Sequence, residues 1–290
     1  MKIGMIGLGA MGMPIAQNLV RADMEVSGYD TVLSQVEAFI QRGGRGCQML
    51  SEAVRDADII LASLPNPGIV ENVMTGAEGV LSSCRKGCCI LDLSSVDPGT
   101  SRRIYETARA KGVHYADAPV SGGVHGASDG TLTIMFGGDP DTWQMVQPVL
   151  KIIGKKLVYV GDIGSGDAIK LVNNLLLGCN MAAIAEALTL GRQLGLSLET
   201  MEEIISSSSG NSYAFTAKMK PFLLPGQFEG GFATDLQYKD LMLALEAGRE
   251  TMVPLPMTAV ASQVFEASRS MGNGKKDMSS AILLWEKLNK

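Results

Sequence analysis

Gly7-Leu8-Gly9-Ala10-Met11-Gly12 decides how the first half of this 290-residue chain folds. An apolar run over residues 3–6 leads into this glycine turn, and a helical pattern over 14–20 leads out of it. In that context Gly7 permits a tight turn, Gly9 lets the backbone approach a pyrophosphate, and Gly12 lets helix and strand pack closely. The backbone N–H groups and the helix dipole at the turn then hold the phosphates of a dinucleotide. The alternative is an ordinary glycine-rich turn between a strand and a helix.

The acid that follows the turn favours the dinucleotide interpretation and predicts the cofactor. A second strand pattern, 25–29, ends in Asp30, which follows Gly12 by 18 residues. A carboxylate there accepts a hydrogen bond from the ribose 2′-OH of NAD and repels the 2′-phosphate of NADP. The next residues are Thr31 and Val32, so no arginine stands beside the acid for a 2′-phosphate. The sequence therefore predicts NAD, with NADP as the second candidate; the alternative role for Asp30 is to cap the next helix.

The composition argues against several classes of protein. The net charge is -5 and no cluster of Lys and Arg forms a basic stripe, so a nucleic-acid partner is not expected. His114 and His125 lack a second ligand at metal spacing, so no metal site is expected. Five cysteines without a C-x-x-C pair indicate reduced thiols and a cytoplasmic protein. Polar residues interrupt the apolar stretch 171–190, which argues against a membrane span.

The chain divides into two regions with different patterns. Up to residue 162, apolar runs that suit buried strands alternate with helical patterns, which predicts a mostly parallel sheet with helices on both faces. Beyond it, a stretch without proline predicts one helix over 166–194, about 42 Å long at 1.5 Å per residue, and the rest is helical with short loops. We therefore expect an α/β fold. Domain 1–162 would be a doubly wound, Rossmann-type NAD(P)-binding sheet, and domain 163–290 an all-α substrate and oligomerisation domain that the long helix joins to it.

Three further clusters are candidates for chemistry. Residues 117–123, Asp-Ala-Pro-Val-Ser-Gly-Gly, follow a predicted strand and offer a hydroxyl and backbone N–H groups to a carboxylate, although a structural turn explains them equally well. On the long helix, Lys170 and Asn174 are four residues apart and share one face. A lysine in a dry cleft can exchange a proton with a substrate hydroxyl, but in an apolar helix it can also extend to the surface or pair with a carboxylate. The third cluster, Lys239-Asp240-Leu241, by itself indicates only a solvated face.

Four motifs together resemble the signature set of the β-hydroxyacid dehydrogenases, the family that includes 3-hydroxyisobutyrate dehydrogenase, tartronate semialdehyde reductase and 6-phosphogluconate dehydrogenase. They are Gly7–Gly12, Asp117–Gly123, the run Gly161-x-x-Gly164-x-Gly166-x-x-x-Lys170-x-x-Asn173-Asn174, and Lys239-Asp240-Leu241. They occur in the family's order and cover essentially the whole chain, and the short C-terminal half resembles the 3-hydroxyisobutyrate type. The resemblance implies an NAD(P)-dependent enzyme, a homodimer or homotetramer, that interconverts a small 3-hydroxy acid and its semialdehyde.

The resemblance also implies roles for residues at matching positions. The catalytic residues would be Lys170, as general acid/base, and Asn174. The substrate carboxylate would bind to Ser121, Gly122 and Gly123, with Asn173 near the substrate. The residues that contact the cofactor would be Gly7, Leu8, Gly9, Ala10, Met11, Gly12, Asp30, Leu64, Pro65, Ser95 and Lys239. A different class of function stays open, which is a dinucleotide-binding module without catalysis, as in relatives that have lost the lysine.

Within the family, three stretches look closest to the branch that interconverts 2-(hydroxymethyl)glutarate and 2-formylglutarate. They are 64–66, 170–181 and 253–259. Asn211 departs from that branch, which carries a basic residue at this position, and a cation is what the second carboxylate of this substrate would need. Tartronate semialdehyde and 3-hydroxyisobutyrate are therefore the alternative substrates.

Overall fold

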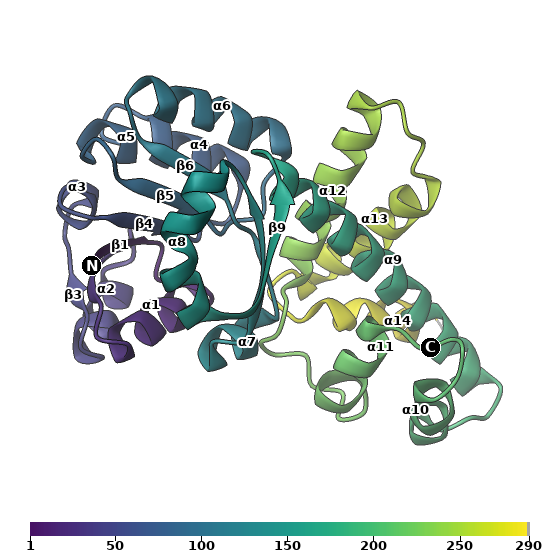
Figure 1. Cartoon of the computed structure of the whole chain (residues 1–290). Coiled ribbons are helices and arrows are strands. Elements are labelled where there is room, and N and C mark those ends of the chain that lie inside the picture. The colour runs from purple at the N-terminus through teal and green to yellow at the C-terminus, as the bar shows by residue number, and fades with distance from the viewer. Residues whose placement is uncertain (289–290) are drawn as a thin grey trace. The chain divides into compact units, whose positions relative to one another are not determined.

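The computed structural model of the chain describes residues 1–288 (Figure 1). It divides after Lys170 into two compact units, each with its own buried core. The helix α9, Ser165–Gln193, crosses this division. The predicted domain boundary, after residue 162, lies just before that helix and stays a prediction.

The first unit is built on one sheet of nine strands in the order β3-β2-β1-β4-β5-β6-β8-β7, with β9 paired to β8. The pairs from β3 to β6 are parallel, whereas β8 runs antiparallel to β6 and β7. The strand order reverses at β1, which is where open α/β sheets bind their ligands. The predicted doubly wound, Rossmann-type sheet is confirmed. Its elements are β1 Lys2–Ile6, α1 Gly12–Arg21, β2 Glu25–Tyr29, α2 Leu33–Gln41, β3 Arg45–Gly46, α3 Leu50–Val54, β4 Ile59–Ala62, α4 Pro67–Thr75, α5 Val80–Ser83, β5 Cys89–Asp92, α6 Pro98–Ala110, β6 His114–Asp117, β7 Val120–Ser121, α7 Gly123–Asp129, β8 Leu132–Gly137, α8 Pro140–Ile153 and β9 Gly154–Gly161.

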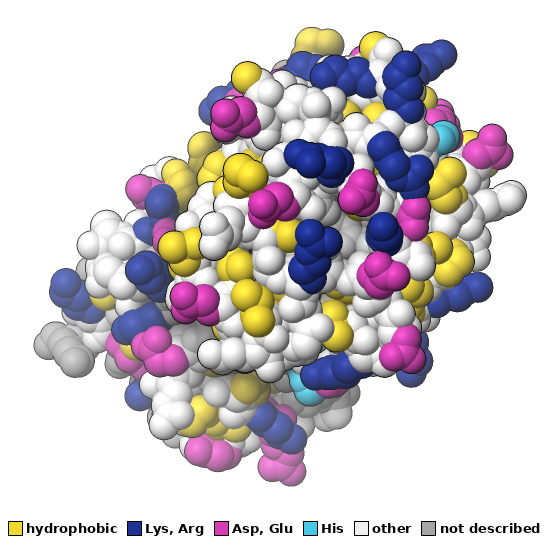
Figure 2. Space-filling view, turned by 90° about the vertical axis from the view of Figure 1, so that its left-hand side faces the viewer, with side chains coloured by type: hydrophobic (Ala, Val, Ile, Leu, Met, Phe, Trp, Pro, Cys, Tyr) yellow, Lys and Arg dark blue, Asp and Glu magenta, His cyan; other side chains and the backbone are white. Residues whose placement is uncertain are grey.

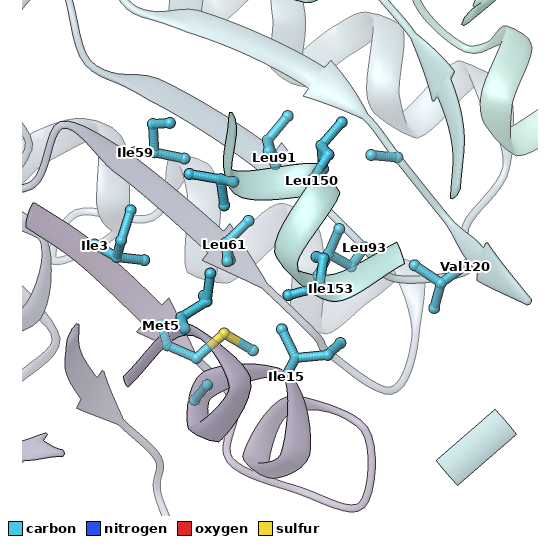
Figure 3. Packing of buried hydrophobic residues seen from close by; sticks show 14 of the residues in the cluster. Ile3, Met5, Ile15, Ile59, Leu61, Leu91, Leu93, Val120, Leu150 and Ile153 are labelled. Atoms are coloured by element: carbon cyan, nitrogen blue, oxygen red, sulfur yellow. The ribbon is translucent and has the colours of Figure 1, made fainter. Parts of the chain in front are cut away.

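Both faces of this sheet are covered, which explains why its strands read as unbroken apolar runs. In β4, Ile59 and Leu61 point to a core formed with α1, α2, α7 and α8 (Figure 3). The alternate residues, Ile60 and Ala62, point to a second core formed with α3, α4, α5 and α6. Because side chains alternate along a strand, one run of hydrophobic residues supplies two cores.

The described residues of the second unit form helices joined by loops, as predicted, with one isolated bridge between Ala233 and Asp277. Its helices enclose a core that includes Met181, Phe215 and Phe265. The elements that follow α9 are α10 Leu198–Ser206, α11 Tyr213–Lys218, a π-helical turn Met219–Leu223, α12 Thr234–Glu250, α13 Pro256–Ser268, a second π-helical turn Arg269–Asn273, a 3₁₀ turn Met278–Ala281 and α14 Ile282–Leu288.

Among the described residues, α9 is the one helix long and apolar enough to cross a membrane by length and composition alone. Its fully buried Met181, Ala185 and Leu188 belong to the core of the second unit. Its polar residues Lys170 and Asn174 are also buried. These residues pack one face of α9 into the interior of the protein. On the face that Figure 2 shows, basic and acidic side chains are interspersed, as on an ordinary solvated surface.

Candidate active site

The glycine turn between β1 and α1 has the geometry that a dinucleotide requires. Gly7 has a φ of +88°, and a Cβ on it would lie 2.3 Å from the carbonyl oxygen of Ser63. A Cβ on Gly12 would lie 1.9 Å from the carbonyl oxygen of Gly7. Around a Cβ on Gly9, in contrast, nothing lies within 4 Å. Two glycines therefore permit close packing inside the protein, and the third leaves open space in front of the turn.

Asp30 braces this turn from the end of β2. Its Oδ2 accepts a hydrogen bond from the backbone N–H of Leu8 at 2.7 Å, and its Oδ1 accepts one from that of Val32 at 2.8 Å. The N-cap of α2 is Val32 and not Asp30, so the acid serves the glycine turn and does not cap the helix itself. Each carboxylate oxygen can accept a second hydrogen bond, so these contacts are compatible with a ribose hydroxyl.

The amino end of α1 faces a groove that suits a phosphate group. No side chain within the described residues caps α1, whose N-cap is Met11. A groove of about 710 Å³ runs beside it from Gly9 and Ala10 toward Arg21 and Arg42. Uncapped helix N–H groups, the helix dipole and nearby arginines all favour anions. The residues of the turn therefore fit a dinucleotide.

The neighbouring strands carry three of the other predicted cofactor residues to the same edge of the sheet, whereas Lys239 lies on α12 in the second unit. Leu64 and Pro65 follow β4, and Ser95 follows β5. The backbone N–H of Leu64 donates to the Oγ of Ser94 at 2.9 Å, which ties these two loops together. Because β1, β4 and β5 are parallel neighbours, their carboxyl ends lie side by side.

The segment 117–123 leaves the carboxyl end of β6 and forms an open backbone turn. Gly122 and Gly123 have φ values of +131° and +62°, which L side chains rarely adopt. Both glycines are exposed and Ser121 is half-buried beside them. This is the arrangement in which a hydroxyl and backbone N–H groups can receive a carboxylate.

Lys170 belongs to the protein interior and not to its surface. Only 8% of the residue is exposed, so the interpretation that it extends to the solvent is wrong. Its Nζ donates a hydrogen bond to the carbonyl oxygen of Val120 at 2.8 Å. That contact puts the amine directly beside the segment that continues into Ser121.

Two buried aspartates without a predicted role lie at the amino end of α9: Asp117, which begins the motif 117–123, and Asp167. Asp117 is fully buried and accepts hydrogen bonds from the backbone N–H groups of Gly164 and Asp167. Burial raises its pKa to about 6, against the lowering effect of those two hydrogen bonds. Asp167 is also fully buried, accepts a hydrogen bond from Ser101, and has a pKa raised well above its usual range by burial and by Asp117. Of the two carboxyl groups, Asp117 is the one whose charged form is favoured by two backbone N–H donors.

In the second unit, Asn174 is held in place by α12. Its Nδ2 donates to the Oδ2 of Asp240 at 2.5 Å, and its Oδ1 accepts from Asn173 at 2.9 Å. Asp240 is 2% exposed and its Oδ1 lies 3.1 Å from the Nζ of Lys239. The interpretation of Lys239-Asp240 as a solvated face is therefore wrong for Asp240, whose partner lies 66 residues away. The side chain of Gln237 adds a hydrogen bond to the carbonyl oxygen of Asn174.

Comparisons with known proteins match both halves of the chain. Residues 2–161 match the family model of the NAD binding domain of 6-phosphogluconate dehydrogenase. Residues 164–285 match the model described as NAD-binding of NADP-dependent 3-hydroxyisobutyrate dehydrogenase. The chain belongs to the 3-hydroxyisobutyrate dehydrogenase-like family of β-hydroxyacid dehydrogenases. It is therefore an NAD(P)-dependent oxidoreductase that acts on the CH–OH group of a hydroxy acid.

Individual relatives of this dehydrogenase support the same conclusion. The 2-(hydroxymethyl)glutarate dehydrogenase of Eubacterium barkeri is 54% identical over 287 residues, which cover 99% of this chain and 95% of the relative. Mitochondrial 3-hydroxyisobutyrate dehydrogenase of Mus musculus is 35% identical, over 97% and 85% of the two chains. The solved structure of Mycobacterium tuberculosis 3-hydroxyisobutyrate dehydrogenase with L-serine has a TM-score of 0.87 at 33% identity and 97% coverage of both chains. The predictions of family, fold class, enzyme class and NAD(P) cofactor are confirmed.

Proposed function

We propose that this dehydrogenase interconverts 2-(hydroxymethyl)glutarate and 2-formylglutarate with NAD, in the cytoplasm. The observation that supports this substrate is the 54% identity to 2-(hydroxymethyl)glutarate dehydrogenase over 99% of the chain. The observation that supports the proposed chemistry is the buried amine of Lys170, bonded to the carbonyl group of Val120. Five free cysteines, among the residues that the structure describes, support a reducing compartment.

In this proposal Lys170 carries the proton and the rest of the site orients the substrate. NAD⁺, when bound, supplies the acceptor for the hydride that leaves the carbinol carbon. During oxidation the Nζ of Lys170 accepts the hydroxyl proton, and during reduction it returns that proton to the forming alcohol. The hydrogen bond to Val120 fixes the direction of the amine, and the anchored amide of Asn174 orients the substrate.

The substrate carboxylate next to the reacting carbon would bind to Ser121, Gly122 and Gly123. The second carboxylate would need a further donor. Asn211 is a poor candidate, because its Nδ2 donates to the carbonyl oxygen of Ser206 and its Oδ1 accepts from Thr216.

A comparison of three acids tests the substrate. With NAD⁺, we expect kcat/KM to be highest for 2-(hydroxymethyl)glutarate, ahead of 3-hydroxyisobutyrate and D-glycerate. If kcat/KM for 3-hydroxyisobutyrate or D-glycerate exceeds that for 2-(hydroxymethyl)glutarate by more than about tenfold, or about 1.4 kcal/mol in transition-state binding, the substrate proposal is wrong. The family assignment stands in that case. If the protein binds NADH and turns over none of these acids, the non-catalytic module becomes the better account.

The preference between the two cofactors is a second prediction. We expect kcat/KM for NAD⁺ to exceed that for NADP⁺ by at least about tenfold, because Asp30 would repel the added 2′-phosphate. Steady-state kinetics with each cofactor at a saturating acid concentration measure the ratio. A higher kcat/KM with NADP⁺ would contradict the role that we propose for Asp30.

The third prediction concerns assembly. Val172 and Leu176 on α9, and Met257 and Val260 on α13, each expose more than half of their surface. Exposed apolar residues that form one large patch mark a protein–protein interface. We therefore propose a homodimer or homotetramer. Light scattering at micromolar concentration should give a multiple of 30.7 kDa, and the mass of a single chain would refute this proposal.

A further inference from the structure

The amino end of α9 is capped by a side chain from a distant strand. Both carboxylate oxygens of Asp117, the last residue of β6, are used for this. Oδ1 accepts from the N–H of Gly164 at 2.7 Å, and Oδ2 accepts from the N–H of Asp167 at 2.8 Å. The first N–H groups of a helix have no partner within the helix, and an anion there is favoured by the helix dipole. Asp117 therefore fixes where α9 begins.

Two glycines make room for this carboxylate. A Cβ on Gly137 would lie 2.6 Å from Oδ1 of Asp117, and a Cβ on Gly166 would lie 2.8 Å from its Oδ2. The Cβ on Gly166 would also lie 2.2 Å from the carbonyl oxygen of Met135, which is backbone and cannot move aside cheaply. The carboxylate thus lies in a space of fixed size between β8 and α9.

The segment that carries Asp117 also holds Lys170. Three residues after Asp167, about 4.5 Å further along the helix, the Nζ of Lys170 donates to the carbonyl oxygen of Val120 at 2.8 Å. The same segment continues into Ser121, the first residue proposed to bind the substrate. One short stretch of chain, 117–123, therefore makes three connections. Asp117 binds the backbone of α9, Val120 binds the amine of Lys170, and residues 121–123 form the proposed carboxylate turn.

We propose that Asp117 is a positioning residue, which sets the height and rotation of α9 so that the amine of Lys170 meets the substrate held at 121–123. The inference rests on the proposed function, because it assigns Asp117 a task only if Lys170 transfers the proton. Asparagine cannot replace the carboxylate, since its NH₂ group would face a backbone N–H, donor against donor. Such a mismatch would displace the first turn of α9, and misplacing a catalytic group by about 1 Å can cost about a hundredfold in rate.

The test compares Asp117→Asn with Asp58→Asn. Asp58 also accepts a backbone hydrogen bond, from Lys2, but lies at the amino end of β4, on the opposite edge of the sheet. We expect Asp117→Asn to lower kcat at least about tenfold. Its Kd for NADH, titrated by fluorescence, should stay within about threefold of the parent value. Asp58→Asn should keep the parent values of both kcat and the Kd for NADH. A kcat of Asp117→Asn within about twofold of the parent value would overturn the proposal.

A second measurement separates positioning from general loss of structure and does not need turnover. An amine-selective reagent followed by mass spectrometry gives the labelling rate of each lysine. In Asp117→Asn we expect Lys170 to label about fivefold faster, the factor for one lost hydrogen bond of ~1 kcal/mol, with other lysines unchanged. A fall in kcat without this change at Lys170 would overturn the proposal. If the parent protein shows no turnover, the proposed function fails and the labelling rates still decide whether Asp117 holds the lysine.

A second variant covers the case in which Asp117→Asn fails to fold. Gly137→Ala keeps the acid and pushes on its carboxylate from the side of β8, since the new Cβ would lie 2.6 Å from Oδ1. We expect the same combination of lower kcat, retained NADH affinity and faster labelling of Lys170. Parent values for both kcat and labelling would overturn the proposal.

Discussion

Replacement of Lys170 by alanine should lower kcat by at least about a hundredfold and leave cofactor binding intact. The reason is that the residue supplies the proton acceptor, while most of the proposed cofactor contacts lie at the glycine turn and at the ends of β2, β4 and β5. The measurements are initial rates with the best acid and fluorescence titration with NADH. Lys155→Ala is the matched control, because this lysine is exposed on β9 in the same unit.

Unchanged turnover of Lys170→Ala would refute the mechanism, although not the fold. A loss of rate together with a loss of NADH affinity would point to a damaged first unit, and thermal unfolding of the variant identifies that case. The expected combination is low kcat, parental NADH affinity and an unfolding temperature within a few degrees of the parental value. Loss of the hydrogen bond from the Nζ of Lys170 to Val120 costs about 1 kcal/mol, which corresponds to a shift of a few degrees in a chain of this length.

The two glycines of the turn should respond differently to the same substitution. Gly12→Ala places a Cβ 1.9 Å from the carbonyl oxygen of Gly7, so the turn must open. We expect a loss of roughly 1–3 kcal/mol in the free energy of unfolding, or more, together with loss of NADH binding. Gly9→Ala meets nothing within 4 Å and should keep the unfolding temperature. Its methyl group stands where a phosphate would approach, so NADH affinity should fall at least about tenfold, or about 1.4 kcal/mol.

This pair of variants separates packing from binding at one turn. Thermal unfolding without cofactor measures the first effect, and fluorescence titration with NADH measures the second. If Gly9→Ala binds NADH as the parent protein does, the cofactor does not approach this turn as we propose. If both variants lose stability equally, the open space in front of Gly9 is not real.

Local patterns predicted the fold well, because each depends on a few neighbouring residues. The buried strands appear as apolar runs. The helix α9 begins and ends one residue before the bounds of the predicted helix, 166–194. The strand β7, two residues long, was missed because such a short element has no periodicity. The antiparallel direction of β8 was also missed, since strand direction depends on the path of the chain and not on composition.

The proposed site was predictable only in part, for a physical reason. The glycine turn and the spacing of Lys170 and Asn174 are local features, and they are visible in the sequence. The partners that hold them are distant. Asp117 bonds to backbone groups 47 and 50 residues away, and Asp240 bonds to an amide 66 residues away. Nothing in the sequence around Asp240 marks it as buried. The sequence therefore indicated a solvated Lys239-Asp240 pair, whereas in the structure Asp240 holds the amide of Asn174.

Hydride transfer from the carbinol carbon is the central claim, and a deuterium label tests it most directly. The acid is 2-(hydroxymethyl)glutarate with both hydrogens of its hydroxymethyl carbon replaced by deuterium. Mass spectrometry then compares the NADH formed with the aldehyde formed. The account predicts one deuterium in the reduced cofactor for each aldehyde produced, in the parent protein and, far more slowly, in Lys170→Ala. NADH that forms without deuterium, or a parent protein that forms no NADH from this acid, from 3-hydroxyisobutyrate or from D-glycerate, would contradict it.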